Sequence, residues 1–357
     1  MGIQKFNALF KSTIKSGCVT DLSGKVVVVD ANNLLNRHLI GQRNRGDDIR
    51  NSTGKKVGHL VVIFRFVIKL RKSNIYPVFV FDGKPSQLKL STIDERRVKK
   101  HCAIDTCTKI SDKADPEYIK YFKRCFELKS HEIEECMELL SAMGVPYIRA
   151  PFEADAQCAA IAKYYSNVAG VVSDDSDMLL YGCGKLYKNF SVRNNFMEDV
   201  DVNNIIKYLQ DISDHARKLV GKNPLTVKRS NFLDICIILG TEYNKRSRIL
   251  GCRPIELVML YAISDYNVRK MINRMDRISL EGMNIFIPDD FYENYLQIKN
   301  EYLDTKVIHP RSIPIDYTEI DRDMLKNIMN DAISDDEYID NGIRFLEKRR
   351  PPRNLFI

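Results

Sequence analysis

The stretch Val26-Val-Val-Val29, followed directly by Asp30, decides the fold. A continuous run of β-branched residues is typical of a strand buried on both faces, and such strands lie inside parallel sheets. A helix-like segment over residues 33–40 follows this run. An apolar segment with helical spacing, residues 59–70, then leads to a second run, Tyr76-Pro-Val-Phe-Val-Phe81. This order of strand, helix and strand predicts a βαβ unit.

The same alternation continues through the next hundred residues. A third strand is predicted at residues 145–148, between helical patterns over 133–143 and 156–165. Residues 168–172 and 185–190 have the composition of two further strands. We therefore predict an α/β fold in which a central, mostly parallel sheet of about five strands or more is flanked by helices.

Acidic residues follow the predicted strands. Asp30 and Asp82 come directly after the first two strands. The third strand is followed by Glu153 and Asp155, and the fourth by Ser173-Asp-Asp-Ser-Asp177. Ligands of open parallel sheets bind beyond the carboxyl ends of the strands, where all these side chains are expected. An Asp after a strand is often only the N-cap of the next helix, which is the simpler interpretation of each residue alone.

The N-cap interpretation is insufficient for the whole set. So many carboxylates at one sheet edge repel one another and are pushed toward protonation, unless bound cations compensate them. Oxygen ligands without clustered His or Cys favour Mg²⁺ or Mn²⁺. Two such ions activate water and stabilise the leaving oxygen of a phosphodiester. The sequence thus predicts a nuclease.

The segment 88–130 interrupts the alternation. It has helical character, holds eleven basic and seven acidic residues, and interleaves them with aromatic residues such as Tyr121 and Phe122. A net charge of +8 for the whole chain permits nucleic-acid binding without proving it. The alternative is a solvated helical hairpin whose aromatic side chains pack on the body of the protein.

Other classes of protein find little support. No apolar run approaches the roughly 18 residues of a membrane span. The nine cysteines form no CxxC pair, and His101, Cys102, Cys107 and Cys125 lack the spacing of a structural zinc site. There is no P-loop, and Gly182-Cys-Gly184 is only part of a dinucleotide-binding motif. Residues 231–239, 254–262, 291–303, 321–333 and 335–346 have helical patterns.

An ordered set of motifs then resembles the XPG-type 5′ nucleases, the flap endonuclease family, and most closely its poxvirus member. The set covers nearly the whole chain. It comprises Met1-Gly-Ile-Gln4, Val29-Asp-Ala31, Phe79-Val-Phe-Asp-Gly-Lys-Pro85, Gly144-Val-Pro-Tyr147, Ala150-Pro-Phe-Glu-Ala-Asp-Ala156, Asp175-Ser-Asp177 and Leu239-Gly-Thr-Glu-Tyr243.

The resemblance implies a nuclease core over residues 1–270 with a PIN-like fold. Within it, 88–130 would be a helical arch for a single-stranded 5′ end, and 229–262 a helix-hairpin-helix-like (H2TH) DNA-binding element. The C-terminal helices, 271–357, would pack on the core and end in a basic tail. The resemblance also implies a structure-specific endonuclease or 5′–3′ exonuclease for DNA replication, recombination or repair, acting on flaps, ends or branches. The resemblance further implies that the protein is located inside the cell, in the host cytoplasm.

The resemblance also assigns roles to single residues. The first metal set would be Asp30, Asp82, Glu153 and Asp155, and the second Asp175, Asp177 and Glu242, for two Mg²⁺ ions that Mn²⁺ could replace. Catalytic cations at the foot of the arch would be Lys89 and Arg96. Contacts to DNA would come from Gly2, Lys84, Arg97, Lys99, Lys100, Arg248, Gly251 and Arg253.

Some residues depart from the family pattern. Glu242 replaces an Asp, and Asn36 stands where cellular members carry a base-stacking Tyr. The hairpin Arg248-Ile-Leu-Gly-Cys-Arg253 keeps a single Gly, residues 208–228 look like an insertion, and Arg353-Asn-Leu-Phe-Ile357 lacks a sliding-clamp motif. Two alternatives therefore stay open: a Holliday-junction resolvase of the same family, and a non-catalytic DNA-binding scaffold on a nuclease fold.

Overall fold

The computed structural model describes residues 2–244, 248–280, 285–349 and 352. Within these ranges a seven-stranded sheet has the order β1-β7-β6-β5-β2-β3-β4. Its central strands are parallel, whereas β7 runs antiparallel to both β6 and β1. The strands are β1 (Lys15–Gly17), β2 (Val26–Asp30), β3 (Tyr76–Phe81), β4 (Tyr147–Arg149), β5 (Val168–Val172), β6 (Lys185–Ser191) and β7 (Phe196–Asp201).

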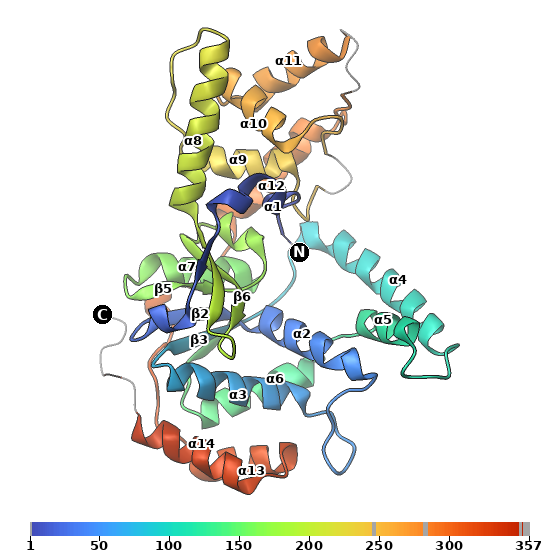
Figure 1. The fold of residues 1–357 in the computed structure, drawn as a ribbon, viewed down its shortest axis with the longest axis vertical. Helices are drawn as coiled ribbons and strands as arrows, with labels where there is room; N and C mark the ends of the chain where they lie inside the picture. Colours follow the sequence, from blue (N-terminus) through green and yellow to red (C-terminus); the bar gives the residue numbers. More distant parts are fainter. Residues whose placement is uncertain (1, 245–247, 281–284, 350–351, 353–357) are drawn as a thin grey trace.

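Helices cover both faces of this sheet (Figure 1). The helices that build the core are α1 (Phe6–Phe10), α2 (Ala31–Gln42), α3 (Gly58–Lys72), α6 (Ser130–Ala142), α7 (Ala154–Tyr164), α8 (Val202–Leu219), α9 (Arg229–Leu239), α10 (Pro254–Ile263), α11 (Val268–Leu280), α12 (Phe291–Asp304), α13 (Arg322–Ala332) and α14 (Asp336–Lys348).

The valine run of β2 explains the two layers. Successive side chains of a strand point to opposite faces. Val26 and Val28 accordingly pack in the core formed with α1 and α7–α12. Val27 and Val29 pack in the second core, which α2, α3, α6, α13 and α14 form. All four valines are at most 1% exposed, so β2 is the buried central strand that the sequence predicts.

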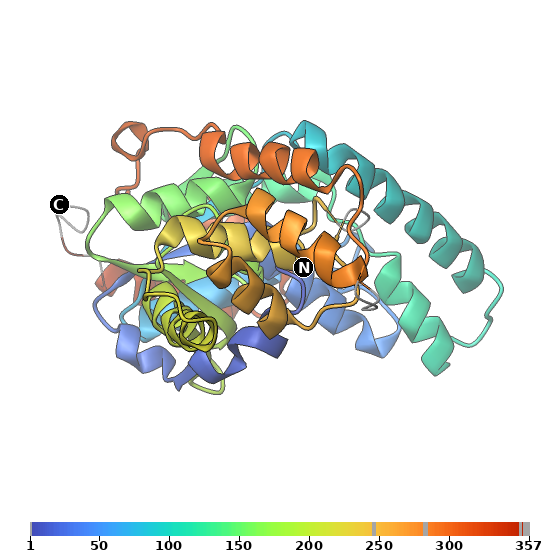
Figure 2. The same cartoon turned by 90° about the horizontal axis from the view of Figure 1, so that it is seen from above.

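The insert consists of α4 (Leu90–Cys107) and α5 (Pro116–Arg124), which pack against each other. Both helices stand away from the sheet at one side of the molecule (Figures 1 and 2). Arg43, beyond the end of α2, anchors α5: its Nη1 donates to the Phe122 carbonyl over 2.7 Å, and its guanidinium lies 4.2 Å from that ring's centre. Bidentate hydrogen bonds to Asp48 hold this guanidinium in place.

The predicted strands and helices of the core are confirmed with shifted ends, and β1, β7, α1, α8 and α11 are additional. β1 is three polar or glycine residues on the edge, so it carries no apolar signal. The segment considered an insertion, 208–228, begins inside α8, whose buried side chains contact α10. The division of the chain at residue 270 stays a prediction. No helix in the described ranges has the length and apolarity needed to cross a membrane.

A close backbone contact sets the position of Asp82. The amide of the next residue, Gly83, donates to the Phe152 carbonyl over 2.6 Å and so joins the segment after β3 to the segment after β4. A Cβ atom at Gly83 would collide with the Ala150 carbonyl oxygen and lie 2.8 Å from the Pro151 carbonyl carbon. Only glycine fits this approach, because backbone atoms offer no rotamer by which to move aside.

We predict that Gly83→Ala lowers the free energy of unfolding by about 2 kcal/mol or more, because backbone must separate to accommodate the methyl group. Urea denaturation measures the loss. The matched control is Gly41→Ala in α2, where a Cβ would meet no atom within 4 Å. This control should be neutral or stabilising by up to about 1 kcal/mol. Equal stability of the two variants would contradict the proposed contact.

Candidate metal centre

The carboxyl ends of the parallel strands meet at one cleft, with a volume of about 270 Å³. The end of β2 and the segments that follow β3, β4 and β5 each deliver an acidic residue to it. The carboxylates that line the cleft are Asp30, Asp82, Glu153, Asp155 and Asp175, and the basic residues Lys84, Lys89 and Arg96 line it with them. Asn36, where the resemblance implies a tyrosine in cellular members, lies in the same cleft.

Local hydrogen bonds fix three of these carboxylates. Asp30 is the N-cap of α2: its Oδ1 accepts from the Asn33 amide, and its Oδ2 accepts from Ser173 Oγ, both over 3.0 Å. Asp82 Oδ1 accepts from the Ala154 amide at the start of α7 over 2.9 Å. Asp175 Oδ1 accepts from the Asp177 amide over 3.1 Å. Because the helices start where the strands end, a carboxylate that accepts from the first turn of a helix also lies at the cleft.

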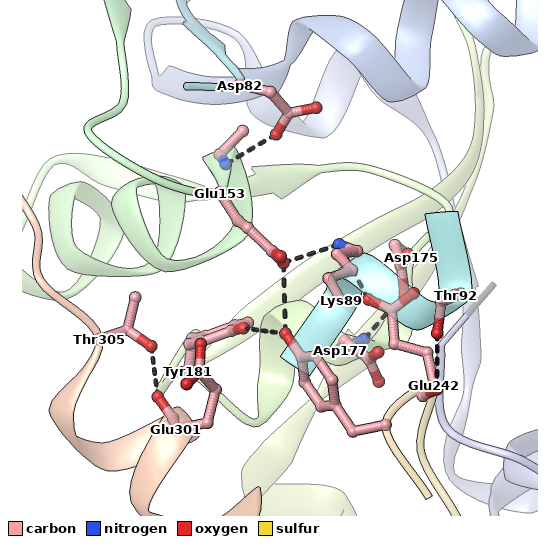
Figure 3. Close-up of polar contacts among 12 residues, drawn as sticks. Asp82, Lys89, Thr92, Glu153, Asp175, Asp177, Tyr181, Glu242, Glu301 and Thr305 are labelled. Atoms are coloured by element: carbon pink, nitrogen blue, oxygen red, sulfur yellow. Dashed lines mark hydrogen bonds and ion pairs between the residues drawn. The ribbon is translucent and has the colours of Figure 1, made fainter. Parts of the chain in front are cut away.

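Lys89 joins the insert to the carboxylates (Figure 3). Its Nζ lies 2.7 Å from Glu153 Oε2 and 2.9 Å from Glu242 Oε1. The second oxygen of Glu242 is 3.0 Å from Nη2 of Arg96 on α4. Both predicted catalytic cations are thus held by Glu242, the residue that departs from the family pattern. Glu242 itself is 4% exposed, and burial, together with the Glu242 charge, raises the pKa values of Glu153 and Asp177.

Burial and mutual repulsion raise the pKa values of the acids. Burial first, and the Asp82 charge second, raise the pKa of Asp30 to about 7. Burial, with Asp175 and Asp30 next, raises the pKa of Asp155 well above its usual value. The pKa of Asp177 rises well above its usual value through burial, Asp175 and Glu242. Burial opposes protonation of Lys89, but Glu153 and Glu242 together raise its pKa.

The cluster therefore contains more carboxyl groups than its own cations can pair with. Three of its oxygen atoms, Glu153 Oε1 and both carboxylate oxygens of Asp177, are buried without a hydrogen-bond partner among the described residues. Buried oxygens with unused lone pairs are costly unless a cation or water satisfies them. An all-oxygen donor set of this kind fits a hard divalent ion such as Mg²⁺.

The carboxylate side chains are not positioned for several of them to coordinate one metal ion. Within the described ranges, no three His, Cys, Asp or Glu side chains converge as ready metal ligands. The ammonium group of Lys89 instead supplies positive charge between Glu153 and Glu242. Lys89 would have to share these carboxylates with an incoming cation, and the unpartnered oxygens would have to turn toward it.

Some residues of the site were missing from the sequence prediction. Ser173 bonds to Asp30, and Tyr243 Oη donates to Glu153 Oε2 over 3.4 Å. Tyr181 Oη is 3.1 Å from Tyr243 Oη. Ser173 opens the acidic run after β5, and Tyr243 ends the motif that contains Glu242, so both lay within the quoted motifs. Tyr181 reaches the site through tertiary packing.

Besides Lys84 in the cleft, the predicted DNA contacts lie in three regions. Gly2 has φ +99°, and a Cβ there would lie 2.6 Å from Asp175 Oδ1, so this position at the edge of the centre requires glycine. Arg97, Lys99 and Lys100 line a second cleft, between α4 and the segment around α5.

The other predicted contacts belong to the helical element of residues 229–262. Arg248 donates to Gln4, and Arg253 pairs with Glu256 over 2.6 Å. Gly251 lies in the turn between them, with φ +86°. Residues 245–247 of the predicted H2TH element, and 353–357 of the predicted clamp-free terminus, lie outside the described residues.

Comparison with known proteins agrees with this geometry. Residues 1–103 match the XPG N-terminal domain, and residues 144–242 match the XPG I-region. Flap endonuclease 1 of Methanococcus aeolicus is 32% identical over 323 residues, which cover 90% of this chain and 85% of that protein.

This chain belongs to the flap endonuclease family of XPG-type nucleases. The catalytic core of Rad2 in complex with DNA substrate is similar in structure, with a TM-score of 0.65, 26% identity, and coverage of 96% of this chain and 100% of that one. Flap endonuclease-1 from Methanococcus jannaschii has the same fold, with a TM-score of 0.66, 24% identity, and coverage of 97% and 98%.

Membership confirms the predicted α/β nuclease fold and the predicted enzyme class. The chain is a structure-specific, metal-dependent DNA nuclease of the flap endonuclease family. The assignment of single residues to metals, to catalysis and to DNA stays a prediction, supported by the geometry of the cleft.

Asp30 should lower the free energy of unfolding of the metal-free protein as the pH rises. Its carboxyl keeps a proton up to about pH 7 in the folded protein, whereas its usual pKa is 3.8. Between these values the folded state binds more protons than the unfolded state, so the free energy of unfolding falls with rising pH. Asp30→Asn should remove this component and, at pH 8 with chelator, raise the free energy of unfolding by roughly 2 kcal/mol.

Urea denaturation from pH 4 to pH 8, with and without Mg²⁺, measures this effect. Asp321→Asn is the matched control, because Asp321 is also an N-cap and accepts from the Met324 amide over 3.0 Å at the start of α13. Its pH profile should follow the wild type. Mg²⁺ should stabilise the wild type more than Asp30→Asn at pH 8. A metal-free Asp30→Asn protein less stable than wild type at pH 8 would refute the charge argument.

Proposed function

We propose that this nuclease hydrolyses DNA phosphodiesters at 5′ flaps or 5′ ends with two Mg²⁺ ions, for which Mn²⁺ can substitute. The observation that carries the proposal is the buried carboxylate cluster with unpartnered oxygens, placed directly beside the basic foot of the helical insert. Acidic side chains alone would repel DNA. Acids that hold cations, flanked by basic residues, attract it.

The chain's own residues have separable roles in this proposal. Asp30, Asp82, Glu153 and Asp155 hold one ion, and Asp175, Asp177 and Glu242 hold the other. When bound, the ions supply positive charge at the scissile phosphate and activate water. Lys89 and Arg96 project from the foot of α4 toward the cleft, where their N–H groups orient and stabilise the phosphate oxygens. To do so, Lys89 and Arg96 must first exchange their carboxylate partners for phosphate oxygens.

The basic insert supports a substrate with a free 5′ strand. Arg97, Lys99 and Lys100 line a cleft of about 1450 Å³ beside α4, and aromatic side chains such as Tyr121 lie in the same cleft. Phosphate oxygens pair with basic groups, and unpaired bases stack on aromatic rings. This combination of cations and aromatic rings suits single-stranded DNA leading away from the metal centre.

Asp177→Asn is predicted to lower the cleavage rate by about 10²- to 10³-fold or more, because it removes charge at the centre of the second metal set. Binding of flap DNA should survive, since Asp177 is 1% exposed and does not face the basic cleft that would hold the strand. Single-turnover cleavage of labelled DNA and fluorescence anisotropy measure the two quantities.

Asp174→Asn is the matched control for Asp177→Asn. Asp174 is in the same acidic run, but it pairs with Arg37 over 3.2 Å and accepts from the Asn189 amide over 2.8 Å. Its substitution should change the rate only a few-fold. An Asp177→Asn protein that cuts at the wild-type rate would show that the metal assignment is wrong.

Two other functions are distinguished by simple measurements. The two helices of the insert argue against a junction resolvase, and a substrate panel of flap, nicked, overhang and four-way DNA tests this: preference for four-way DNA would support a resolvase. A scaffold is favoured by one observation, that both oxygens of Glu242 are engaged by Lys89 and Arg96. Calorimetry that detects no Mg²⁺ binding would support the scaffold.

We further propose that the nuclease serves a poxvirus and acts at cytoplasmic sites of viral DNA replication, recombination or repair, without a sliding-clamp motif. The support is the resemblance of its ordered motifs to the poxvirus member, together with its departures from cellular members at Asn36 and Glu242. Imaging of the tagged protein in infected cells tests the location. Accumulation in the nucleus would contradict it.

A further inference from the structure

Two cysteines of the insert meet between its helices. Cys107 is the last residue of α4, and Cys125 directly follows α5. Their sulfur atoms are 3.9 Å apart, and both side chains are partly exposed. Residues 108–124 form the loop and helix that connect them. A thiol pair at this separation needs the sulfurs to approach by only about 2 Å to reach the length of a disulfide bond.

This pair lies at the margin of the basic cleft. The cleft is lined on one side by α4 up to Thr106 and on the other by residues around Cys125, including Arg124 and Phe126. The Lys100 ammonium also pairs with Glu127, so α4 and the segment after α5 are already joined once across the cleft. The contact between the Cys107 and Cys125 sulfurs is a second place where α4 meets the segment after α5.

The segment after α5 is attached to the nuclease core through Arg43. Its guanidinium lies 4.9 Å from the centre of the Phe126 ring and 4.2 Å from the centre of the Phe122 ring. Cys125 stands between these two aromatic residues in sequence. A covalent bond from Cys125 to Cys107 would therefore connect α4 to a segment that the core holds in place.

We propose that Cys107 and Cys125 are a redox site: oxidation by a small-molecule disulfide, such as glutathione disulfide, joins them and fixes the width of the basic cleft. The step conserves atoms and electrons. The Cys107 thiolate attacks one sulfur of glutathione disulfide and releases a glutathione thiolate. Cys125 then attacks the Cys107 sulfur of this mixed disulfide and releases the second. The two cysteine protons pass to the released thiolates, and reduced glutathione reverses the reaction.

Fixing this width should hinder entry of a DNA strand. A strand that enters the cleft must compete for Lys100 and separate α4 from Glu127, whereas a disulfide keeps α4 tied to the segment after α5. Cleavage of a 5′ flap should therefore be slower in the oxidised protein. This effect on cleavage rests on the proposed function, but formation of the disulfide does not.

The second step should depend on pH. Burial, then the hydrogen bond to Cys107, raise the pKa of the Cys125 thiol to about 11. Only the thiolate attacks, and below this pKa its fraction grows about tenfold for each pH unit. Closure of the mixed disulfide should therefore be slow near neutral pH and accelerate as the pH rises toward 9.

The test compares the wild type with Cys107→Ser, Cys125→Ser and Cys102→Ser. Cys102 is the matched control, since it is an exposed cysteine on the same helix, α4. After exposure to glutathione disulfide, we expect wild type and Cys102→Ser to become lighter by two hydrogen atoms, with a peptide pair that joins Cys107 to Cys125. Dithiothreitol should reverse the change. Cys125→Ser should stop at the glutathione mixed disulfide.

Cleavage of a 5′ flap should fall several-fold on oxidation in wild type and Cys102→Ser, and recover on reduction. Cys107→Ser should not respond. The redox site would be overturned if no disulfide-linked Cys107–Cys125 peptide pair formed. It would also be overturned if the pair formed between two protein molecules as readily as within one. A complete disulfide with unchanged flap cleavage would overturn control of the cleft. If the reduced protein cuts no substrate, the proposed function fails, while the mass measurement still decides the disulfide.

Discussion

Repulsion among buried carboxylates is the constraint on which the rest of this structure depends. Asp30, Asp155 and Asp177 are each less than 9% exposed, and their pKa values are raised by burial and by one another. Such a cluster weakens a fold unless its charge is compensated. In this protein the cluster lies at the ends of parallel strands whose side chains fill two cores.

Compensation by Lys89 connects the metal centre to the insert. Lys89 is the N-cap of α4, so its ion pairs with Glu153 and Glu242 fix where α4 starts. At the other end of the insert, Arg43 fixes α5 to the residues that follow α2. Because Asp30 is the N-cap of α2, the same helix supports the metal centre and the insert. The positions of α4 and α5 therefore depend on the charge of the carboxylates at the metal centre.

The resemblance implies an Asp at the position of Glu242, and the structure shows what the longer side chain does there. A glutamate places its carboxylate one methylene further from the backbone than an aspartate. In this chain both of its oxygens are engaged, one by Lys89 and one by Arg96. Glu242 thus orders the two predicted catalytic cations, and its approach to a metal ion requires that these pairs loosen.

The sequence by itself determined the layers and the chemistry of the site. The valine run fixed a central strand because side chains alternate between two faces that are both buried, and acids at strand ends fixed the oxygen character of the cleft. It did not reveal β1, whose short polar stretch forms a strand only because β7 offers an edge.

Only the tertiary structure brought the Tyr243 hydroxyl to Glu153, paired Lys89 with Glu242, which stands 153 positions later in the chain, and placed Cys107 beside Cys125. These contacts join residues whose local sequence would be the same without them. Local patterns record which faces are buried, whereas the partners of a charged or thiol side chain depend on how separate elements pack.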